Sequence, residues 1–366
     1  MKRIRHFGFA ALILLWAGLV LCGWFGPAKD ISESERRPLA QMPEITLDNI
    51  LKGKFMGDFE DYSLDQFPLR DTFRQVKSLF HYYVLNQSDN NDIYIVDGSA
   101  VKQEYPLNQA SVKHALGRLN HIYEKYLADS GSRILMVVVP DKGYYLAEES
   151  GHLAMDYEKL FTMLEENLPW ASFVDITGTL SAADYYRTDT HWRQEKLLDA
   201  AKALCEALET ENFDQEELAL EKIERPFYGV YYGQAALPME PEQMYFLAGD
   251  ILAGCTVFDH ESGKTGSIYD MSKLESRDLY DVFLSGAKPL LTIENPAAAT
   301  DRELIVFRDS FGSSMVPLLV KDYAKVTLVD IRYIASDLVG NFLTFEGQDV
   351  LFMYSTLILN NSNSLK

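Results

Sequence analysis

The feature that most constrains the fold is an uncharged stretch near the amino terminus, residues 7–26, with the sequence FGFAALILLWAGLVLCGWFG. As an α-helix rising about 1.5 Å per residue, it is roughly 30 Å long, which matches the hydrocarbon core of a bilayer. Lys2, Arg3 and Arg5 precede it, and such positive clusters stay on the cytoplasmic side. We therefore expect residues 1–27 to form a cytoplasmic tip and a single-pass transmembrane anchor, with the remaining chain outside the cytoplasm.

A cleaved signal peptide is the alternative to a retained anchor. The apolar run is long for the core of a signal peptide, and no clear cleavage site of the A-x-A type follows it. Cys22 would be the modified residue of a lipoprotein, but the preceding Leu-Val-Leu lacks the small residue that this processing needs. The sequence favours a retained anchor and leaves cleavage open.

The composition argues against one class of partner. The chain has 366 residues, of which 47% are hydrophobic, enough for one large domain or two smaller ones. Its formal net charge is −20, whereas phosphate binding needs a basic surface, so nucleic acid is not an expected partner. Outside the cytoplasm Cys205 and Cys255 can pair, although two separate buried thiols are slightly favoured.

Residues 28–90 are expected to form a juxtamembrane linker followed by a helical segment. The linker is polar and contains proline. Phe55, Phe59 and Tyr62 then recur at helical spacing, and Pro68 should end this helix. A second helix is expected over residues 71–85.

Residues 91–366 alternate between strand-like and helical patterns. Asp97-Gly98 separates two strand-like runs, which predicts a hairpin. The run RILMVVVP is continuously apolar, as expected of a strand buried on both faces. Further strands are expected at ASFVDI, ELIVF, KVTLVD and DVLFMYS, and helices at 192–208, 313–323 and 335–343 among others. This order predicts an α/β domain with a parallel sheet and helices on both faces, with an aromatic-rich insertion at about 213–300.

Polar residues follow three of these strands, at the sheet edge where parallel sheets bind ligands. Arg308-Asp309-Ser310 follows ELIVF just before Gly312, a strand–turn–helix arrangement like that of a nucleophile elbow. His191 can take the proton of the Ser310 hydroxyl, and Asp189 can orient the imidazole. Serine acyl transfer is the chemistry that these residues favour, with Ser310, His191 and Asp189 as catalytic candidates.

Each candidate also has a simpler interpretation. Ser310 and Asp189 are both suitable helix N-caps, and a lone histidine is often a packed or surface residue. Metal ligation is not expected, because no H-E-x-x-H motif or Cys/His cluster accompanies Asp189 and His191. No cofactor is expected either.

Eight further residues are weaker candidates. Residues that can line the site are Asp309, Arg308, Lys142, Arg332 and Trp192. Residues that can stack on a sugar are Tyr228, Tyr231 and Tyr232, although aromatic packing of a small sheet is the slightly favoured explanation.

Several stretches together resemble one known family. They are ERRPLAQMPEI, GKFMGDFEDYSLDQFPLRDTF, VVPDKGYY, YYRTDTHW, PFYGVYYGQAALP and RDSFGSSMVPLLVKDYAKVTLVDIRYI. Their order and spacing are similar to those of the SGNH-hydrolase-like O-acetyltransferases of the alginate acetylation type (AlgJ/AlgX-like), and within them the DHHW proteins of Gram-positive bacteria. The resemblance covers nearly all of the chain outside the predicted anchor.

This resemblance implies an SGNH-like α/β fold and a triad of Asp189, His191 and Ser310. It also implies transfer of an acetyl group to a hydroxyl of an exported or cell-wall polysaccharide, with a membrane-bound O-acyltransferase of the MBOAT class as the usual acetyl donor. The alternatives are a carbohydrate O-acetylesterase with the same triad and a non-catalytic glycan-binding component of a polysaccharide assembly machine.

The chain departs from the family pattern at two positions. Thr190 stands where the family motif has its first histidine, and Arg308 stands where a G-D-S block has glycine. The D-x-H pair is intact in spite of the first change. The second change puts the oxyanion geometry in question.

Overall fold

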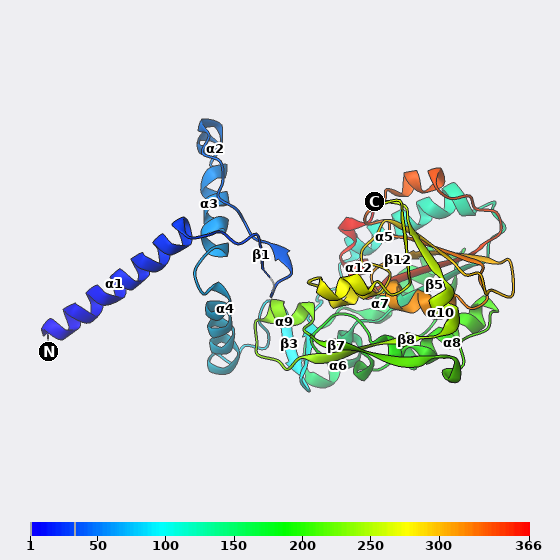
Figure 1. Ribbon diagram of the computed structural model, residues 1–366, viewed down its shortest axis with the longest axis horizontal. Helices are drawn as coiled ribbons and strands as arrows, with labels where there is room; N and C mark the ends of the chain where they lie inside the picture. Colours follow the sequence, from blue (N-terminus) through cyan, green and yellow to red (C-terminus); the bar gives the residue numbers. More distant parts are fainter. Residues whose placement is uncertain (1, 33) are drawn as a thin grey trace. The chain divides into compact units, whose positions relative to one another are not determined.

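The computed structural model describes residues 2–32 and 34–366, which form two compact units (Figure 1). The first unit holds the chain up to Asn91 together with Tyr232–Met239, and the second holds Asp92–Tyr231 and Glu240–Lys366. Asp189, His191 and Ser310 all lie in the second unit.

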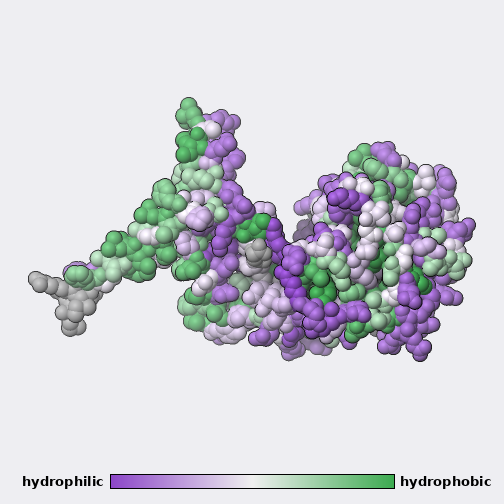
Figure 2. Space-filling model, in the orientation of Figure 1, coloured by the Kyte–Doolittle hydropathy of each residue, from purple (hydrophilic) through white to green (hydrophobic). Residues whose placement is uncertain are grey.

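The first unit is mainly helical. The uncharged amino-terminal stretch forms α1 (Lys2–Phe25), whose residues His6–Phe25 are long and apolar enough to cross a membrane. Figure 2 shows hydrophobic residues along the visible side of this helix. The other elements are the antiparallel pair β1 (Ile31–Ser32) and β2 (Arg37–Pro38) and the helices α2 (Leu47–Leu51), α3 (Lys54–Asp65) and α4 (Arg70–Leu79).

Pro68 separates α3 from α4, as predicted. A proline has no backbone N–H and disfavours a helical conformation of the residue before it, so one helix ends and another begins here. α4 continues into a π-helical turn, η1 (Phe80–Val84), and the predicted helix over 71–85 is confirmed.

The second unit is built on an eight-stranded sheet with the strand order β10-β9-β11-β13-β12-β14-β5-β6. Five neighbouring strands are parallel: β13 (Lys325–Val329), β12 (Glu303–Arg308), β14 (Asp349–Ser355), β5 (Ile134–Val139) and β6 (Ser172–Val174). Every residue of β5 is buried, with Val137 in the core on one face and Met136 in the core on the other. The predicted α/β fold with a doubly buried sheet is confirmed.

Three strands at one edge add an antiparallel part to the predicted parallel sheet. β9 (Thr256–Asp259), β10 (Lys264–Gly266) and β11 (Leu290–Glu294) are antiparallel to their neighbours. The turn between β9 and β10 is too short for the crossover that a parallel pair needs. All three come from the stretch 213–300, which also contains the antiparallel pair β7 (Ala219–Phe227) and β8 (Glu242–Ala248).

Helices cover both faces of the sheet. α5 (Gln109–Ile122), which continues into η2 (Tyr123–Leu127), and α7 (Tyr157–Asn167) contribute to the core that contains Met136, whereas α8 (Leu198–Leu208) contributes to the core that contains Val137. The remaining α-helices are α6 (Lys142–Ser150), α9 (Val230–Ala235), α10 (Asp250–Gly254), α11 (Gly312–Met315) and α12 (Thr356–Asn360).

Three helix predictions need correction. The helix expected to start at Trp192 begins at Leu198, after an isolated bridge between Tyr185 and Trp192 and the 3₁₀ turn η5 (Gln194–Lys196). The helix expected over 313–323 is the single turn α11 followed by the 3₁₀ turn η9 (Val316–Leu319), which contains Pro317. The segment 335–343 forms the 3₁₀ turn η10 (Ser336–Asn341).

The predicted hairpin is confirmed as β3 (Ile93–Val96) and β4 (Ser99–Lys102). Asp97 and Gly98 between them both have positive φ, at 48° and 77°, as a type I′ turn requires. Cys205 and Cys255 are separate buried thiols, and burial raises the pKa of each to about 11.

Candidate active site

The three catalytic candidates meet at the carboxyl end of the parallel strands. Ser310 follows β12, and His191 follows β6 on a different segment of the chain. The distance from His191 Nε2 to Ser310 Oγ is 2.8 Å, and the distance from His191 Nδ1 to Asp189 Oδ1 is 2.6 Å. Asp189 is fully buried, His191 is 8% exposed and Ser310 is partly exposed. The hydroxyl is therefore the member of the three that a substrate can reach most readily.

The loop around His191 is held in a tight shape by its own backbone. Tyr185 pairs with Trp192, and the Tyr186 N–H donates to the His191 carbonyl at 3.0 Å. The Asp189 carboxylate accepts from the backbone N–H groups of His191, at 3.0 Å, and Val230, at 2.7 Å. These bonds orient the carboxylate and, through it, the imidazole. Asp189 is thus not a helix N-cap.

Gly229 allows the chain before α9 to approach this loop closely. A Cβ at position 229 would lie 2.2 Å from the Thr188 carbonyl oxygen and 2.4 Å from Asp189 Cα. The Gly229 N–H also donates to Thr188 Oγ1 at 2.9 Å. No side chain fits in this space, so glycine is required for the backbone contact that supports Asp189.

Glu242 holds the same loop from β8, and the sequence pattern offered no signal for it. Its carboxylate accepts hydrogen bonds from the backbone N–H groups of Arg187 and Thr188 and from Thr188 Oγ1, at 2.7–2.8 Å. Thr190, at the departure from the family motif, accepts a hydrogen bond from the Tyr231 hydroxyl at 3.1 Å.

Asp309 and Arg308 support the turn that carries Ser310. The fully buried Asp309 carboxylate accepts from the backbone N–H groups of Phe311, at 3.0 Å, and Ser355, at 2.8 Å, which joins the turn to the end of β14. The Arg308 side chain is also fully buried and donates to the Ser313 hydroxyl at 3.1 Å and to the Asp309 carbonyl at 3.3 Å.

A buried charge cluster lies behind the turn. Arg332 forms two hydrogen bonds with Asp330, and the Arg308 guanidinium is 3.9 Å from the same carboxylate. Burial lowers the pKa of Arg308. Gly312 leaves the room that the Arg308 side chain needs, because a Cβ at 312 would lie 2.8 Å from Arg308 Cβ. The side chain of Arg308, at the position where a G-D-S block has glycine, therefore fits in the protein interior beneath the serine turn.

Trp192 joins the histidine loop to the serine turn. Its indole N–H contacts Ser314 Oγ at 2.9 Å and the Phe311 carbonyl at 3.2 Å. Gln194 adds a second link, since its amide donates to the Ser314 carbonyl at 2.9 Å. Tyr280, from the 3₁₀ turn η8 (Leu279–Val282), stacks on the His191 ring. The sequence alone did not predict a role for Gln194 or Tyr280, because the residues around them in the sequence do not differ from those around ordinary core residues.

Lys142 lies below the histidine loop and is 2% exposed. Its ammonium group donates to the carbonyls of Tyr186, at 2.9 Å, and Arg187, at 3.2 Å, and lies 5.2 Å from the ring centroid of Tyr231. Burial lowers the pKa of Lys142 to about 7, although the carboxylates of Asp189 and Glu242 act in the opposite direction. These two hydrogen bonds indicate that Lys142 stabilises the conformation of the histidine loop.

The three tyrosines predicted as a sugar-stacking group have different surroundings. Tyr231 is buried against Lys142, Tyr228 is 40% exposed, and Tyr232 falls in the first unit. Within the described residues, no group of three or more His, Cys, Asp or Glu side chains is arranged to hold a metal ion.

The mostly parallel α/β fold is that of an SGNH-hydrolase-like protein. Residues 99–244 match the family model described as SGNH hydrolase-like domain, acetyltransferase AlgX, and residues 178–329 match the model described as DHHW protein. The resemblance predicted from the sequence is thereby confirmed. At the level of the class, these matches support an O-acetyltransferase type of function.

Solved structures show the same fold. A DHHW family protein from Eubacterium siraeum is similar with a TM-score of 0.61 and 23% identity, over 76% of this chain and 95% of that chain. Bacillus cereus PatB1, in a structure with a sulfonyl adduct, is similar with a TM-score of 0.59 and 14% identity, over 73% of this chain and 95% of that chain. None of the curated proteins matches the chain.

Proposed function

We propose that this protein is an extracytoplasmic, membrane-anchored O-acetyltransferase that moves an acetyl group through a serine acyl-enzyme to a hydroxyl of an exported or cell-wall polysaccharide. The observation that carries the proposal is the contact of His191 Nε2 with Ser310 Oγ, at 2.8 Å, while Asp189 holds the opposite ring nitrogen. The match to the acetyltransferase AlgX domain supports the same chemistry.

The first half of the reaction forms the acyl-enzyme. His191 takes the proton of Ser310 as the hydroxyl oxygen attacks the acetyl carbonyl carbon of the donor, and Asp189 stabilises the imidazolium that results. The tetrahedral intermediate collapses, the bond between the acetyl carbon and the donor oxygen breaks, and His191 returns its proton to the leaving oxygen. Ser310 then carries an acetyl ester.

The second half repeats the sequence with the acceptor. His191 takes the proton of a glycan hydroxyl, whose oxygen attacks the acetyl-serine carbonyl, and Ser310 leaves with the proton returned by His191. If water takes the place of the glycan hydroxyl, the same steps release acetate. The outcome depends on which nucleophile reaches the acyl-enzyme.

The backbone N–H of Ser310 is the proposed oxyanion donor. It donates no hydrogen bond to any of the described residues, whereas the N–H groups of Phe311, Gly312 and Ser313 are engaged within the turn. A free, preorganised N–H beside the attacking hydroxyl stabilises the negative charge that develops on the carbonyl oxygen.

The membrane topology completes the proposal. α1 is compatible with a single-pass anchor, and the basic residues before it favour a cytoplasmic amino terminus. A polysaccharide outside the cytoplasm is then the acceptor, and a membrane-bound O-acyltransferase of the MBOAT class is the proposed source of the acetyl group.

The test compares the full-length wild type with Ser310→Ala in detergent, with Ser262→Ala, an exposed serine, as the matched control. p-Nitrophenyl acetate is the donor, with and without a glucose oligosaccharide as acceptor. We expect Ser310→Ala to lower the turnover by about 10³-fold or more and the control to leave it unchanged. Equal turnover of wild type and Ser310→Ala would overturn the triad. An acetylated oligosaccharide indicates a transferase, and release of acetate alone indicates an esterase.

A further inference from the structure

One side of α4 and η1 presents large apolar side chains to the exterior of the first unit. Phe73 is 41% exposed, Val76 58%, Phe80 50%, Tyr83 68% and Val84 65%. Their spacing places them on one helical face. Large exposed apolar patches mark surfaces that contact another molecule or a membrane.

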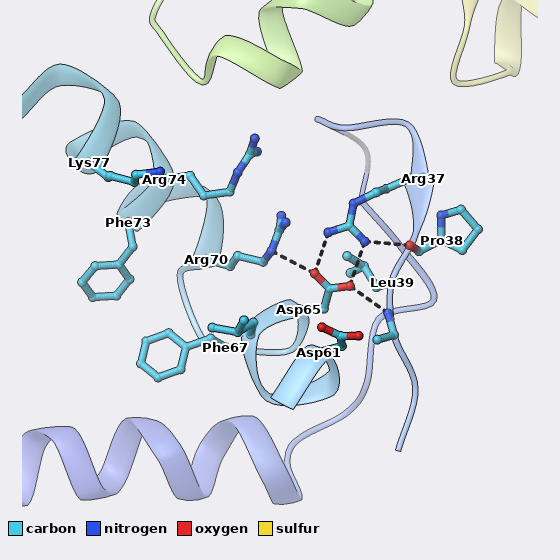
Figure 3. Close-up of a pocket in the computed structure, with 12 residues that line it drawn as sticks. Arg37, Pro38, Leu39, Asp61, Asp65, Phe67, Arg70, Phe73, Arg74 and Lys77 are labelled. Atoms are coloured by element: carbon cyan, nitrogen blue, oxygen red, sulfur yellow. Dashed lines mark hydrogen bonds and ion pairs between the residues drawn. The ribbon is translucent and has the colours of Figure 1, made fainter. Parts of the chain in front are cut away.

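The two arginines of α4 point away from this face, and the exposed Lys77 lies beside it (Figure 3). Arg70 and Arg74 form ion pairs with Glu35, and Arg70 also pairs with Asp65. Arg70, Arg74 and Asp65 line a cavity of about 950 Å³. Figure 3 shows the rings of Phe67 and Phe73 on the side of α1 and the guanidinium groups of Arg70 and Arg74 directed away from it. α4 therefore has the two-sided character of helices that lie at a membrane interface.

The apolar face is continuous with α1. The Trp16 ring contacts the rings of Phe67 and Phe73, with centroid distances of 5.9 and 6.3 Å. Trp16 precedes the last residue of α1, Phe25, by nine residues, which is about 14 Å along a helix axis. If α1 spans the bilayer, Phe73 is at the depth of the acyl chains in the outer leaflet, about 15 Å thick.

Further contacts hold α3 to the carboxyl end of α1. The Trp24 indole donates to Ser63 Oγ at 3.1 Å, and its ring lies 5.3 Å from that of Phe59. The Tyr62 hydroxyl donates to the Gly23 and Trp24 carbonyls at 3.4 and 3.3 Å. α3 and α4 are therefore held beside the anchor by contacts that begin near its mid-length.

We propose that α4 and η1 form an amphipathic helix embedded in the outer leaflet of the membrane, with phospholipid as the molecule that covers its apolar face. The inference rests on the proposed membrane anchor. The face contacts acyl chains through Phe73, Val76, Phe80 and Val84. Lipid is the chosen occupant because this face continues directly from the surface of the proposed bilayer span.

The experiment uses the full chain with Cys22→Ala, reconstituted in nanodiscs of phosphatidylcholine and phosphatidylglycerol. An environment-sensitive thiol dye is placed at Phe80→Cys, and in a second protein at Gln75→Cys, an exposed position of the same helix away from the apolar face. Tyr83→Cys provides a second test position. Cys205 and Cys255 are 1% and 3% exposed, and the Cys22→Ala protein without an added cysteine measures their background labelling.

We expect doxyl-labelled lipid to quench the dye at positions 80 and 83 at least about 3-fold more than at 75, and aqueous iodide to show the reverse order. Equal access of iodide to positions 75 and 80 would overturn the inference. Protection of position 80 from both quenchers would also overturn it, since a second copy or another protein then covers the face.

A label at Leu14→Cys in α1 separates this inference from the proposed anchor. Lipid quenching at position 14 without quenching at position 80 rejects the embedding of α4 and η1 alone, whereas no lipid quenching at either position rejects both proposals. Turnover of p-nitrophenyl acetate by the same nanodiscs reports on the proposed chemistry independently of either result.

Discussion

The imidazole of His191 lies flat on the phenol ring of Tyr280, with ring centroids 3.8 Å apart and an angle of 9° between the planes. The Tyr280 hydroxyl is 2.7 Å from Ser314 Oγ, which Trp192 also contacts. The plane of the proposed base is thus set by an aromatic ring from η8 as well as by Asp189. The hydroxyl of Tyr280 contacts Ser314 behind the serine turn and forms no hydrogen bond with His191.

Separate substitutions distinguish the ring of Tyr280 from its hydroxyl. Tyr280→Phe keeps the stack and removes one hydrogen bond, so we expect kcat/KM to change by less than about 3-fold and stability to fall by about 1 kcal/mol. Tyr280→Leu removes the stack, which is worth about 1 kcal/mol, and should lower kcat/KM by up to about 10-fold. Steady-state kinetics and urea unfolding check both, and equal kinetic losses in the two variants would contradict a role for the ring.

Asp189→Asn should leave the fold intact and remove most of the activity. The amide lacks the charge that stabilises imidazolium and favours a different imidazole tautomer, so kcat should fall by about 10³ to 10⁴-fold. Asp337→Asn, an exposed carboxylate that contacts His121, is the matched control and should keep full activity. A loss of less than 10-fold in Asp189→Asn would show that another group orients His191.

Gly229→Ala tests the close backbone contact beside Asp189. The new methyl group would meet the Thr188 carbonyl at 2.2 Å, so the loop must move. We expect stability to fall by about 1–3 kcal/mol and kcat to fall by about 100-fold, because a small displacement of a catalytic group has a large kinetic cost. Gly254→Ala, where no atom lies within 4 Å of the added Cβ, is the control and should be neutral or slightly stabilising in urea unfolding. Normal kinetics in Gly229→Ala would mean that Asp189 tolerates the shift.

The pKa of Lys142 predicts a specific pH dependence of stability. Burial lowers this pKa to about 7 in the folded protein, whereas the unfolded chain keeps a value near 10.5. Between these values the unfolded chain holds a proton that the folded protein has released, so this group makes the free energy of unfolding rise with pH. Relative to Lys142→Met, the wild type should gain stability from about pH 7 upward and show a constant difference below it.

Urea unfolding of the wild type and Lys142→Met at pH 6, 8 and 9.5 measures the difference in their free energies of unfolding. The contributions of other titrating groups largely cancel in this difference. A difference that stays constant across the three pH values would show that Lys142 titrates near its ordinary pKa. Lys142→Met also leaves the carbonyls of Tyr186 and Arg187 without their shared donor, so an additional loss of about 1–3 kcal/mol is expected at every pH.

Strand positions were predictable where the signal was local. The fully buried runs of β5, β12 and β14 are continuous apolar stretches, and Asp97-Gly98 is a recognised turn pair, so each was located from its own residues. Helix starts were less predictable. The residues after Trp192 have a helical pattern, which predicted a helix that starts at Trp192. The backbone from Asp189 to Trp192 instead forms a turn and a bridge, because the Asp189 carboxylate accepts hydrogen bonds from the N–H groups of His191 and Val230.

The sequence by itself determined the apolar amino-terminal helix, the order of strands and helices in the α/β domain, and the choice of Ser310, His191 and Asp189 as candidates. Those features depend on residue type and on the spacing of neighbours along the chain. Only the tertiary structure decided that His191 and Ser310, 119 residues apart, lie within hydrogen-bonding distance, and that Glu242, Gly229 and Tyr280 hold the loop in place. Such contacts depend on how strands align and how side-chain volumes pack, which no local pattern encodes.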